Sequence, residues 1–184
     1  MTYGIAAGGG AGMALAEWIA NGQPPYDLWP VDIRRFGKPH QDLEWVRKRT
    51  YEAYAKHYTM AWPFEEHSSG RPFQQSPIYE NLKNANACFG EKLGWERPNW
   101  FAPKSMEPVD HYTYDRQNWF EIVGEEVKAT REKAVLIDQT SFAKFEISGS
   151  QALDALEYLC ANNVNKGIGS TIYTQMLNNH GGIE

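Results

Sequence analysis

Glycines near the start of the chain have the spacing of a ligand-binding turn. Tyr3-Gly4-Ile5 is typical of a strand end, Gly8-Gly9-Gly10-Ala11-Gly12 of a turn, and residues 13–22 of a helix that Asn21-Gly22 closes. A strand, a glycine turn and a helix in this order bring backbone N–H groups and the positive helix end against an anion. Glycine also lets the backbone approach a flat ligand closely. The alternative is a turn that only permits tight helix–sheet packing.

Two other groups of polar residues favour structural roles. Glu65 and Glu66 are adjacent, which puts their side chains on opposite sides of a strand or about 100° apart on a helix. They therefore indicate a solvated face rather than a catalytic pair. Arg97 is close in sequence to Trp95 and Trp100, so its guanidinium suits a ligand carboxylate or an aromatic ring. Structural packing on an aromatic ring is the favoured interpretation.

The cysteines and histidines lack the spacing of redox or metal sites. Cys88 and Cys160 form no CxxC motif, which favours two buried thiols in a reducing compartment. Neither HxH nor HExxH spacing occurs among the histidines, which are His40, His57, His67, His111 and His180. We therefore expect no metal site, and these patterns assign no catalytic residue.

The bulk composition is that of a globular protein. The chain has 184 residues, of which 42% are hydrophobic and 22% charged, enough for one domain or two small pieces. Its net charge of −5 argues against nucleic acid as a partner, because phosphate binding needs clustered Lys and Arg. The apolar N-terminal stretch has no basic start and is interrupted by Glu17. We therefore expect neither a signal peptide nor a membrane span, and a cytoplasmic location.

Capping and turn residues predict the elements of the middle section. Asp42 is the predicted N-cap of a helix. That helix would bury one face and leave the other charged, the two faces being Leu43, Val46, Thr50 and Tyr54, and Glu44, Arg47, Lys48 and Glu52. Pro63 and Ser68-Ser69-Gly70 indicate loops, and Ser76-Pro77 a helix start. Residues 101–116 are expected to form a connecting loop.

The last third of the chain predicts alternating helices and strands. Helical spacing joins the apolar residues Trp119, Ile122, Val123 and Val127. Residues 135–138 suit a buried strand, and the alternation in 143–147 suits a half-buried one. After a turn at Gly149, Ser150 is a plausible N-cap for a helix that would bury Leu153, Leu156, Leu159 and Cys160.

The chain closes on a predicted hairpin. Gly167 and Gly169 lead into a strand at 172–177, and residues 178–182 have the composition of a turn. Only two residues follow that turn, so we expect the returning strand to be incomplete.

Several motifs in fixed order carry a family resemblance. The last third contains RE-x-AVLID-x-TSFAKFEI, YT-x-MLN and GGIE. Together they resemble the start of the folate-binding aminomethyltransferase domain of the glycine-cleavage T-protein and of dimethylglycine and sarcosine dehydrogenases. The segment GQPPYDLWPVDIRRFG resembles the end of the flavin domain of those dehydrogenases. RPFQQSPIYENLK and ACFGEKLGWERPNWF resemble their linking domain.

The resemblance implies an α+β chain in three consecutive parts. Residues 1–35 would be the C-terminal end of an FAD-dependent oxidoreductase domain. Residues 36–108 would be the central or linking domain, and residues 109–184 the start of the aminomethyltransferase domain. In such proteins FAD takes hydride from an N-methyl group of dimethylglycine or sarcosine, and tetrahydrofolate captures the one-carbon unit. The small-molecule partners expected are thus an N-methyl amine and folate.

The resemblance also implies site residues. The positions expected to pass the pyrimidine edge of FAD are Gly4, Ile5, Gly8, Gly9, Gly10 and Gly12. A helix N-terminus there would favour the negative charge of the reduced flavin. Tyr173 matches a tyrosine that lines the folate pocket, the alternative being an ordinary strand aromatic.

Two departures from the family pattern decide what we expect of this chain. It contains no GxGxxG fingerprint for the ADP half of FAD, and it does not reach the acidic partner of Tyr173 beyond GGIE. We therefore expect an internal fragment that does not oxidise amines alone, in the mitochondrial matrix if eukaryotic. The alternatives are a complete, non-catalytic docking subunit of a multi-chain flavin and folate amine oxidase, and a free-standing folate module.

Overall fold

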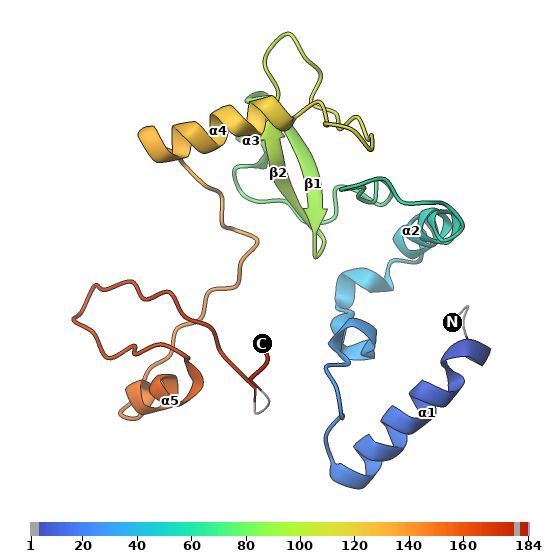
Figure 1. Cartoon of the computed structure of the whole chain (residues 1–184), viewed down its shortest axis with the longest axis vertical. Helices are drawn as coiled ribbons and strands as arrows, with labels where there is room; N and C mark the ends of the chain where they lie inside the picture. The colour runs from blue at the N-terminus through green and yellow to red at the C-terminus, as the bar shows by residue number, and fades with distance from the viewer. Residues whose placement is uncertain (1–3, 179–180, 184) are drawn as a thin grey trace. The chain divides into compact units, whose positions relative to one another are not determined.

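The chain forms two compact units, Met1–Ser141 and Phe142–Glu184. The computed structural model describes residues 4–178 and 181–183. In chain order the elements (Figure 1) are α1 (Gly4–Asn21), η1 (Trp29–Val31), η2 (Ile33–Arg35), η3 (Lys38–Gln41), α2 (Leu43–Lys56), α3 (Tyr79–Asn84), β1 (Ala87–Lys92), β2 (Trp95–Phe101), α4 (Phe120–Glu132) and α5 (Ala152–Leu159). Helices with a two-stranded sheet confirm the predicted α+β class.

The β1–β2 hairpin is the element on which the first unit is built, and sequence analysis did not predict it. Two residues, Leu93 and Gly94, connect the antiparallel strands, with φ of 51° and 83°. Positive φ at both positions is the signature of a type I′ turn, whose twist matches that of the flanking strands. A two-residue connection ending in glycine between aromatic-containing runs was the available sequence signal.

A bulge interrupts the register of the hairpin. Cys88 pairs with Trp100 and Phe89 with Pro98, so Asn99 has no partner of its own. Proline cannot donate a ladder hydrogen bond, and a bulge is one of the few places where a strand tolerates it. The bulge therefore accommodates Pro98.

Trp100 is the centre of a small core between the hairpin and α4. Its side chain is 1% exposed, the lowest value among the described residues of the core. The buried members beside it are Cys88 and Ala102, and the partly buried members from the start of α4 are Trp119, Ile122 and Val123. The apolar spacing predicted for residues 119–127 is confirmed as helical, although Val127 is 50% exposed.

Helix α2 begins as predicted but packs through a different face. The Asp42 carboxylate accepts hydrogen bonds from the N–H groups of Glu44 and Trp45 at 2.9 and 3.3 Å. Leu43 and Tyr54, assigned to the buried face, are 81% and 53% exposed. Of the predicted face only Val46 is half-buried, and the other half-buried residues of this helix are Trp45, Arg49, Glu52 and Lys56. Polar side chains are buried here because each finds a partner outside the helix.

The N-terminal prediction of a strand end and a glycine turn is wrong. Gly4–Asn21 forms one continuous helix, and Tyr3 lies outside the described residues. A strand must bond a neighbour, and in the described ranges the only sheet is β1 with β2. A helix satisfies its backbone internally, and the alanines of this segment favour it. The predicted end at Asn21 is confirmed, with Gly22 at φ +75°.

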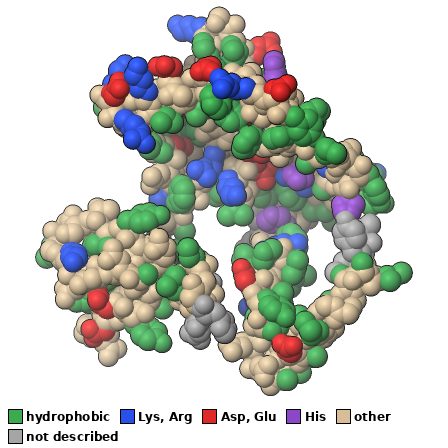
Figure 2. Space-filling model, in the orientation of Figure 1, with side chains coloured by type: hydrophobic (Ala, Val, Ile, Leu, Met, Phe, Trp, Pro, Cys, Tyr) green, Lys and Arg blue, Asp and Glu red, His purple; other side chains and the backbone are tan. Residues whose placement is uncertain are grey.

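Helix α1 leaves much apolar surface uncovered. Ile5, Leu15 and Ile19 are 102%, 57% and 77% exposed. Figure 2 shows hydrophobic side chains over the surface of this helix. Only Ala14 is buried among its described residues. The helix therefore rests on internal hydrogen bonds more than on packing.

Two predicted strands in the last third of the chain are also wrong. Residues 135–138 and 143–147 have no regular secondary structure. Leu136 and Phe145, expected to be buried, are 91% and 86% exposed. The physical reason is the same, since neither segment pairs with a described strand. Residues 172–177 form only isolated bridges, Cys160 with Met176 and Leu177 with Ile183.

Helix α5 is confirmed with a different start. The turn at Gly149 has φ +124°, but the N-cap is Gln151 rather than Ser150, and no side chain caps it. Leu153 and Leu159 are 43% and 45% exposed, so the expected burial is not found. In the predicted turn at 178–182, the N–H of Asn178 bonds the carbonyl of Gly182 at 2.9 Å. Asn179 and His180 lie outside the described residues.

Between α2 and β1, the predicted loops are confirmed and one helix start is not. Residues 63 and 68–70 lie in loops, and the loop after β2 begins at residue 102. Helix α3 starts at Tyr79 with Ile78 as N-cap, not at Ser76-Pro77. Ser76 is buried, and its hydroxyl has no hydrogen-bond partner.

In the described ranges, no helix has both the length and the apolar content needed to cross a membrane.

Two glycine-to-alanine substitutions with opposite expected effects on stability test this fold. A Cβ at Gly94 would lie 2.7 Å from the Phe73 ring, at a φ of +83°. We expect Gly94→Ala to lower the free energy of unfolding by at least about 1–2 kcal/mol, the cost of a left-handed L-residue. At Gly124, inside α4, a Cβ meets nothing within 4 Å. Gly124→Ala should therefore stabilise the chain by roughly 0.5–1 kcal/mol. Urea unfolding of the matched variants measures both, and equal effects would contradict the hairpin geometry.

Candidate functional site

The predicted flavin-contacting residues lie along one helix instead of a turn. They are Gly4, Ile5, Gly8, Gly9, Gly10 and Gly12 of α1, and all are exposed. A Cβ built on any of these glycines meets nothing within 4 Å. In the described structure they form no cradle around a ligand. Their contact with FAD stays a prediction.

The predicted folate residue belongs to the second unit. Tyr173 is 86% exposed, and its backbone carbonyl accepts a hydrogen bond from the Asn162 side chain at 3.2 Å. Neither strand pairing nor burial holds its ring. Its role at folate likewise stays a prediction.

Glu65 and Glu66 do not form the solvated face that we expected. Glu65 accepts from the N–H of Trp62 at 3.0 Å and pairs with Lys56 at 3.2 Å. Glu66 accepts from the N–H of Glu91 at 2.5 Å. Both side chains are half-buried. Lys56 belongs to α2 and Glu91 to β1, so the adjacency of the two glutamates in the sequence could not reveal these contacts.

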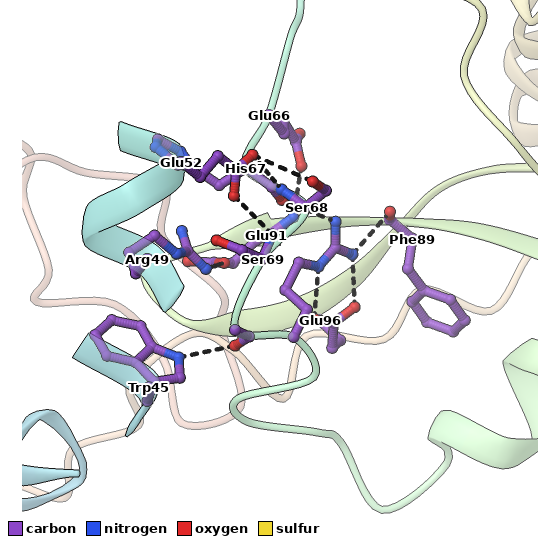
Figure 3. A network of polar contacts seen from close by, with 12 residues as sticks. Trp45, Arg49, Glu52, Glu66, His67, Ser68, Ser69, Phe89, Glu91 and Glu96 are labelled. Atoms are coloured by element: carbon purple, nitrogen blue, oxygen red, sulfur yellow. Dashed lines mark hydrogen bonds and ion pairs between the residues drawn. The ribbon is translucent and has the colours of Figure 1, made fainter. Parts of the chain in front are cut away.

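Residues 66–71 form a loop that charged side chains hold on two sides (Figure 3). On the α2 side, Glu52 accepts hydrogen bonds from the N–H groups of Ser68 and Ser69 at 2.8 and 2.6 Å. Glu52 also pairs with Lys56 at 2.8 Å. Burial raises the pKa of Glu52, but the hydrogen bonds from Lys56, Ser69 and Ser68 outweigh it and hold that pKa well below its ordinary value.

On the hairpin side, Arg71 makes the most buried ion pair of this loop. Its guanidinium donates to both carboxylate oxygens of Glu96, Nε to Oε1 at 2.8 Å and Nη2 to Oε2 at 2.6 Å. The side chains are 18% and 3% exposed. Nη2 also donates to the carbonyl of Phe89 at 2.8 Å, and Nη1 to that of His67 at 3.3 Å. The Glu96 hydrogen bonds raise the pKa of Arg71.

Two further contacts join α2 to the same region. Arg49 forms an ion pair with Glu91 of β1, with side chains 16% and 14% exposed. The indole N–H of Trp45 donates to the carbonyl of Gly70 at 2.8 Å. Helix, loop and hairpin are therefore connected by specific polar contacts.

A half-open cavity of about 260 Å³ lies between the loop after α2, the hairpin and the start of α4. Four kinds of side chain line it: aromatic rings, carboxylates, one amide and one aliphatic group. The lining residues are Phe64, Trp100 and Trp119, Glu66 and Asp110, and Asn99 and Val123. They come from the loop after α2, from β2, from the loop after β2 and from the start of α4. We call this cavity the acidic pocket.

Hydrogen bonds and ring contacts fix the walls of the acidic pocket. The Trp100 indole N–H donates to Asp110 at 2.7 Å. Asn99, the bulge residue, donates to Glu66 at 3.3 Å. The Phe64 and Trp119 rings meet edge to face, with centroids 5.5 Å apart. The bulge that accommodates Pro98 therefore also places Asn99 at this pocket.

Two groups near the pocket have a raised pKa, chiefly because they are buried. Burial raises the pKa of Cys88 to about 12, with the charge of Asp110 adding to the shift. Burial also raises the pKa of Tyr112, which a hydrogen bond from the backbone of Glu66 opposes and the charges of Asp110 and Glu66 support. A buried, protonated Cys88 is a poor nucleophile at neutral pH.

The arginine and the two cysteines singled out from the sequence lie outside the lining of the acidic pocket. Arg97 is half-buried in β2 and pairs across the hairpin with Gly90. Cys88 is a buried free thiol, as predicted, whereas the free thiol of Cys160 is only half-buried. The described residues contain no group of three or more His, Cys, Asp and Glu side chains that could hold a metal ion.

Two domain families match consecutive parts of the chain. Residues 21–76 match the FAD dependent oxidoreductase central domain, and residues 78–184 match the GCVT N-terminal domain. This order confirms the predicted resemblance. The predicted boundaries after residues 35 and 108 stay predictions.

Curated relatives match along nearly the whole chain. The 4-methylaminobutanoate oxidase (formaldehyde-forming) of Paenarthrobacter nicotinovorans is 38% identical over 100% of this chain and 22% of its own length. The mitochondrial sarcosine dehydrogenase of Mus musculus is 35% identical over 98% and 22%. The mitochondrial pyruvate dehydrogenase phosphatase regulatory subunit of Mus musculus is 37% identical over 98% and 21%. The chain spans about a fifth of the length of these relatives.

The buried ion pair between Arg71 and Glu96 gives a further prediction about stability. Arg71→Leu would leave the Glu96 carboxylate, 3% exposed, without its cation. We expect the free energy of unfolding to fall by about 3–5 kcal/mol, enough to unfold the hairpin region. The double variant Arg71→Leu/Glu96→Leu should be more stable than the single one. Chemical denaturation followed by tryptophan fluorescence measures this. Arg116→Ala, from a pair with side chains 65% and 79% exposed, is the control and should change nothing measurable.

Glu52 generates a pH prediction. Its pKa is lowered in the folded chain from an ordinary value of 4.5. The carboxylate therefore stabilises the fold fully above that value, and this contribution is lost as pH falls below it toward the folded pKa. We expect Glu52→Gln to destabilise the chain at pH 7 and to lessen the loss of stability on acidification. Glu44→Gln, with a side chain 75% exposed, should follow the wild-type curve. Parallel curves for wild type and Glu52→Gln would contradict the loop contacts.

Proposed function

The chain belongs to the GCVT N-terminal domain family, preceded by an FAD dependent oxidoreductase central domain, and on this premise we propose that it works within a flavin- and folate-dependent oxidoreductase of N-methyl amines. The carrying observation is the succession of these two domains in one chain. FAD would accept hydride from an N-methyl group, and tetrahydrofolate would take up the one-carbon unit. The chain would supply the linking region and the start of the folate domain.

The names of the relatives support this substrate class. They include 4-methylaminobutanoate oxidase, sarcosine dehydrogenase and dimethylglycine dehydrogenase. Each name refers to an amine with an N-methyl group. Dimethylglycine and sarcosine are the substrates that we propose to test first. The mammalian dehydrogenases among these relatives are named as mitochondrial, which supports a mitochondrial location for a eukaryotic source; a cytoplasmic location for any other source stays a proposal.

Among the residues that the structure describes, the proposed FAD and folate contacts lie on exposed surface. The proposed FAD contacts lie on an exposed continuous helix, and Tyr173 is 86% exposed. A flavin needs a cradle of backbone and side-chain groups that excludes water. We therefore assign no step of hydride or one-carbon transfer to a residue of this chain. We propose that these positions reach FAD and folate only beside further protein.

A second candidate function is a non-catalytic docking subunit of a multi-chain flavin and folate amine oxidase. One observation favours it: a relative at 37% identity is named as a regulatory subunit. Exposed apolar residues along α1, such as Ile5 and Ile19, would suit attachment to a second chain.

Sequencing the coding DNA on both sides of this region, followed by assay of the encoded product, tests the first proposal. We expect a GxGxxG flavin domain upstream and an acidic folate-pocket residue downstream. The encoded product should reduce an electron acceptor with dimethylglycine or sarcosine and yield methylenetetrahydrofolate. The 184-residue chain with added FAD should show no turnover. Start and stop codons at the ends of this region would support the docking subunit instead, and amine oxidation by the chain alone would contradict both proposals.

A further inference from the structure

We propose that the acidic pocket binds a small organic cation, an ammonium or methylated ammonium group on a molecule that carries no carboxylate. This inference goes beyond the proposed function, because the lining of the pocket includes neither the predicted FAD contacts of α1 nor Tyr173. It stands on the charge, the aromatic walls and the size of the cavity.

The charge of the lining is negative. Glu66 and Asp110 are the lining residues with ionisable carboxylates, and no Lys or Arg appears among the described residues that line the cavity. Two cations of neighbouring segments pair with other carboxylates, Arg71 with Glu96 and Lys56 with Glu52. Lys56 also donates to the backbone carbonyl of Glu66 at 2.7 Å, not to its carboxylate. A cation entering the pocket would therefore meet carboxylates whose charge is not neutralised within it.

The carboxylates are already positioned. Glu66 accepts hydrogen bonds from the N–H of Glu91 and the amide of Asn99, and Asp110 accepts from the indole of Trp100. A carboxylate has about four lone-pair sites, so each can accept a further N–H from a ligand. Because these contacts already orient both groups, a ligand would not have to order them on binding.

The aromatic walls favour the same ligand class. Phe64 and Trp119 are the accessible aromatic residues of the lining, whereas Trp100 is 1% exposed and contributes chiefly through the core. An aromatic ring attracts a cation through its negative face, most strongly in Trp. Methyl groups on an ammonium also gain by apolar contact with these rings and with Val123. A simple metal cation would forgo that contact.

The size and charge of the pocket exclude other classes. A cavity of about 260 Å³ is just below the range of drug-sized sites, which suits a ligand of few atoms. A carboxylate on the ligand would be repelled by Glu66 and Asp110, since like charges in a partly buried site disfavour each other. Zwitterionic N-methyl amino acids, which the proposed function assigns to the flavin, are therefore not expected here.

The test follows the indole N–H of Trp100 by ¹H–¹⁵N NMR of the 184-residue chain during titration with methylammonium chloride. We expect a saturable shift of this signal. Sodium chloride at equal ionic strength controls for charge screening, tert-butanol for apolar contact and sarcosine for the carboxylate. None of the three should produce a saturable shift. No saturation with methylammonium, or equal shifts with tert-butanol, would overturn the proposal without any variant.

Two isosteric variants sharpen the test. Glu66→Gln and Asp110→Asn keep a hydrogen-bond acceptor and remove the charge, so each should weaken methylammonium binding about ten-fold. Glu80→Gln removes an exposed charge on α3 and should bind as the wild type does. A dispersed amide spectrum establishes that each variant is folded. Wild-type affinity in both folded pocket variants would overturn the proposal, whatever the outcome of the amine assays.

Discussion

The ion pair between Arg71 and Glu96 is the contact on which the first unit depends. It joins the loop of residues 66–71 to β2 at a point where the carboxylate is 3% exposed. Arg71 also donates to the carbonyls of Phe89 and His67. One side chain therefore contacts both strands of the hairpin and the loop that precedes it. Burying a charge is costly unless it is paired and hydrogen-bonded. The pairing geometry is therefore a condition for the fold, not an addition to an apolar core.

The small apolar core explains why polar contacts have this weight. Besides Trp100, the buried core residues of this cluster are only Cys88 and Ala102. A core of this size buries little apolar surface to offset conformational entropy. Ring contacts such as that of Trp45 with Phe73, whose centroids are 4.7 Å apart, add to this core, as do salt bridges and hydrogen bonds between α2, the loop and the hairpin. They give specificity at a cost in desolvation, which is why removal of one partner is expected to be worse than removal of both.

The same contacts create the acidic pocket. The backbone N–H of Glu91 orients the carboxylate of Glu66, and the bulge places the amide of Asn99 against the same carboxylate. Trp100 serves both as core centre and, through its indole N–H, as the partner of Asp110. Structure and candidate binding site therefore share residues in the linking region. The two domain matches meet at this pocket: Phe64 and Glu66 lie in the first, and Asn99, Trp100, Asp110, Trp119 and Val123 in the second.

Local sequence determined the features that depend on neighbours along the chain. The Asp42 cap, the apolar spacing of α4, the helix end at Asn21 and the loops all follow from capping, periodicity and turn chemistry, and ordered motifs identified the family. Tertiary structure alone decided which face of α2 is buried, because the partners of Arg49 and Glu52 lie 42 and 17 residues away. It also decided that residues 135–138 and 143–147 are not strands, since strand formation requires a partner that no local pattern supplies. The pocket was likewise beyond local prediction: its walls come from residues 64 to 123, and only folding brings those carboxylates and rings to one cavity.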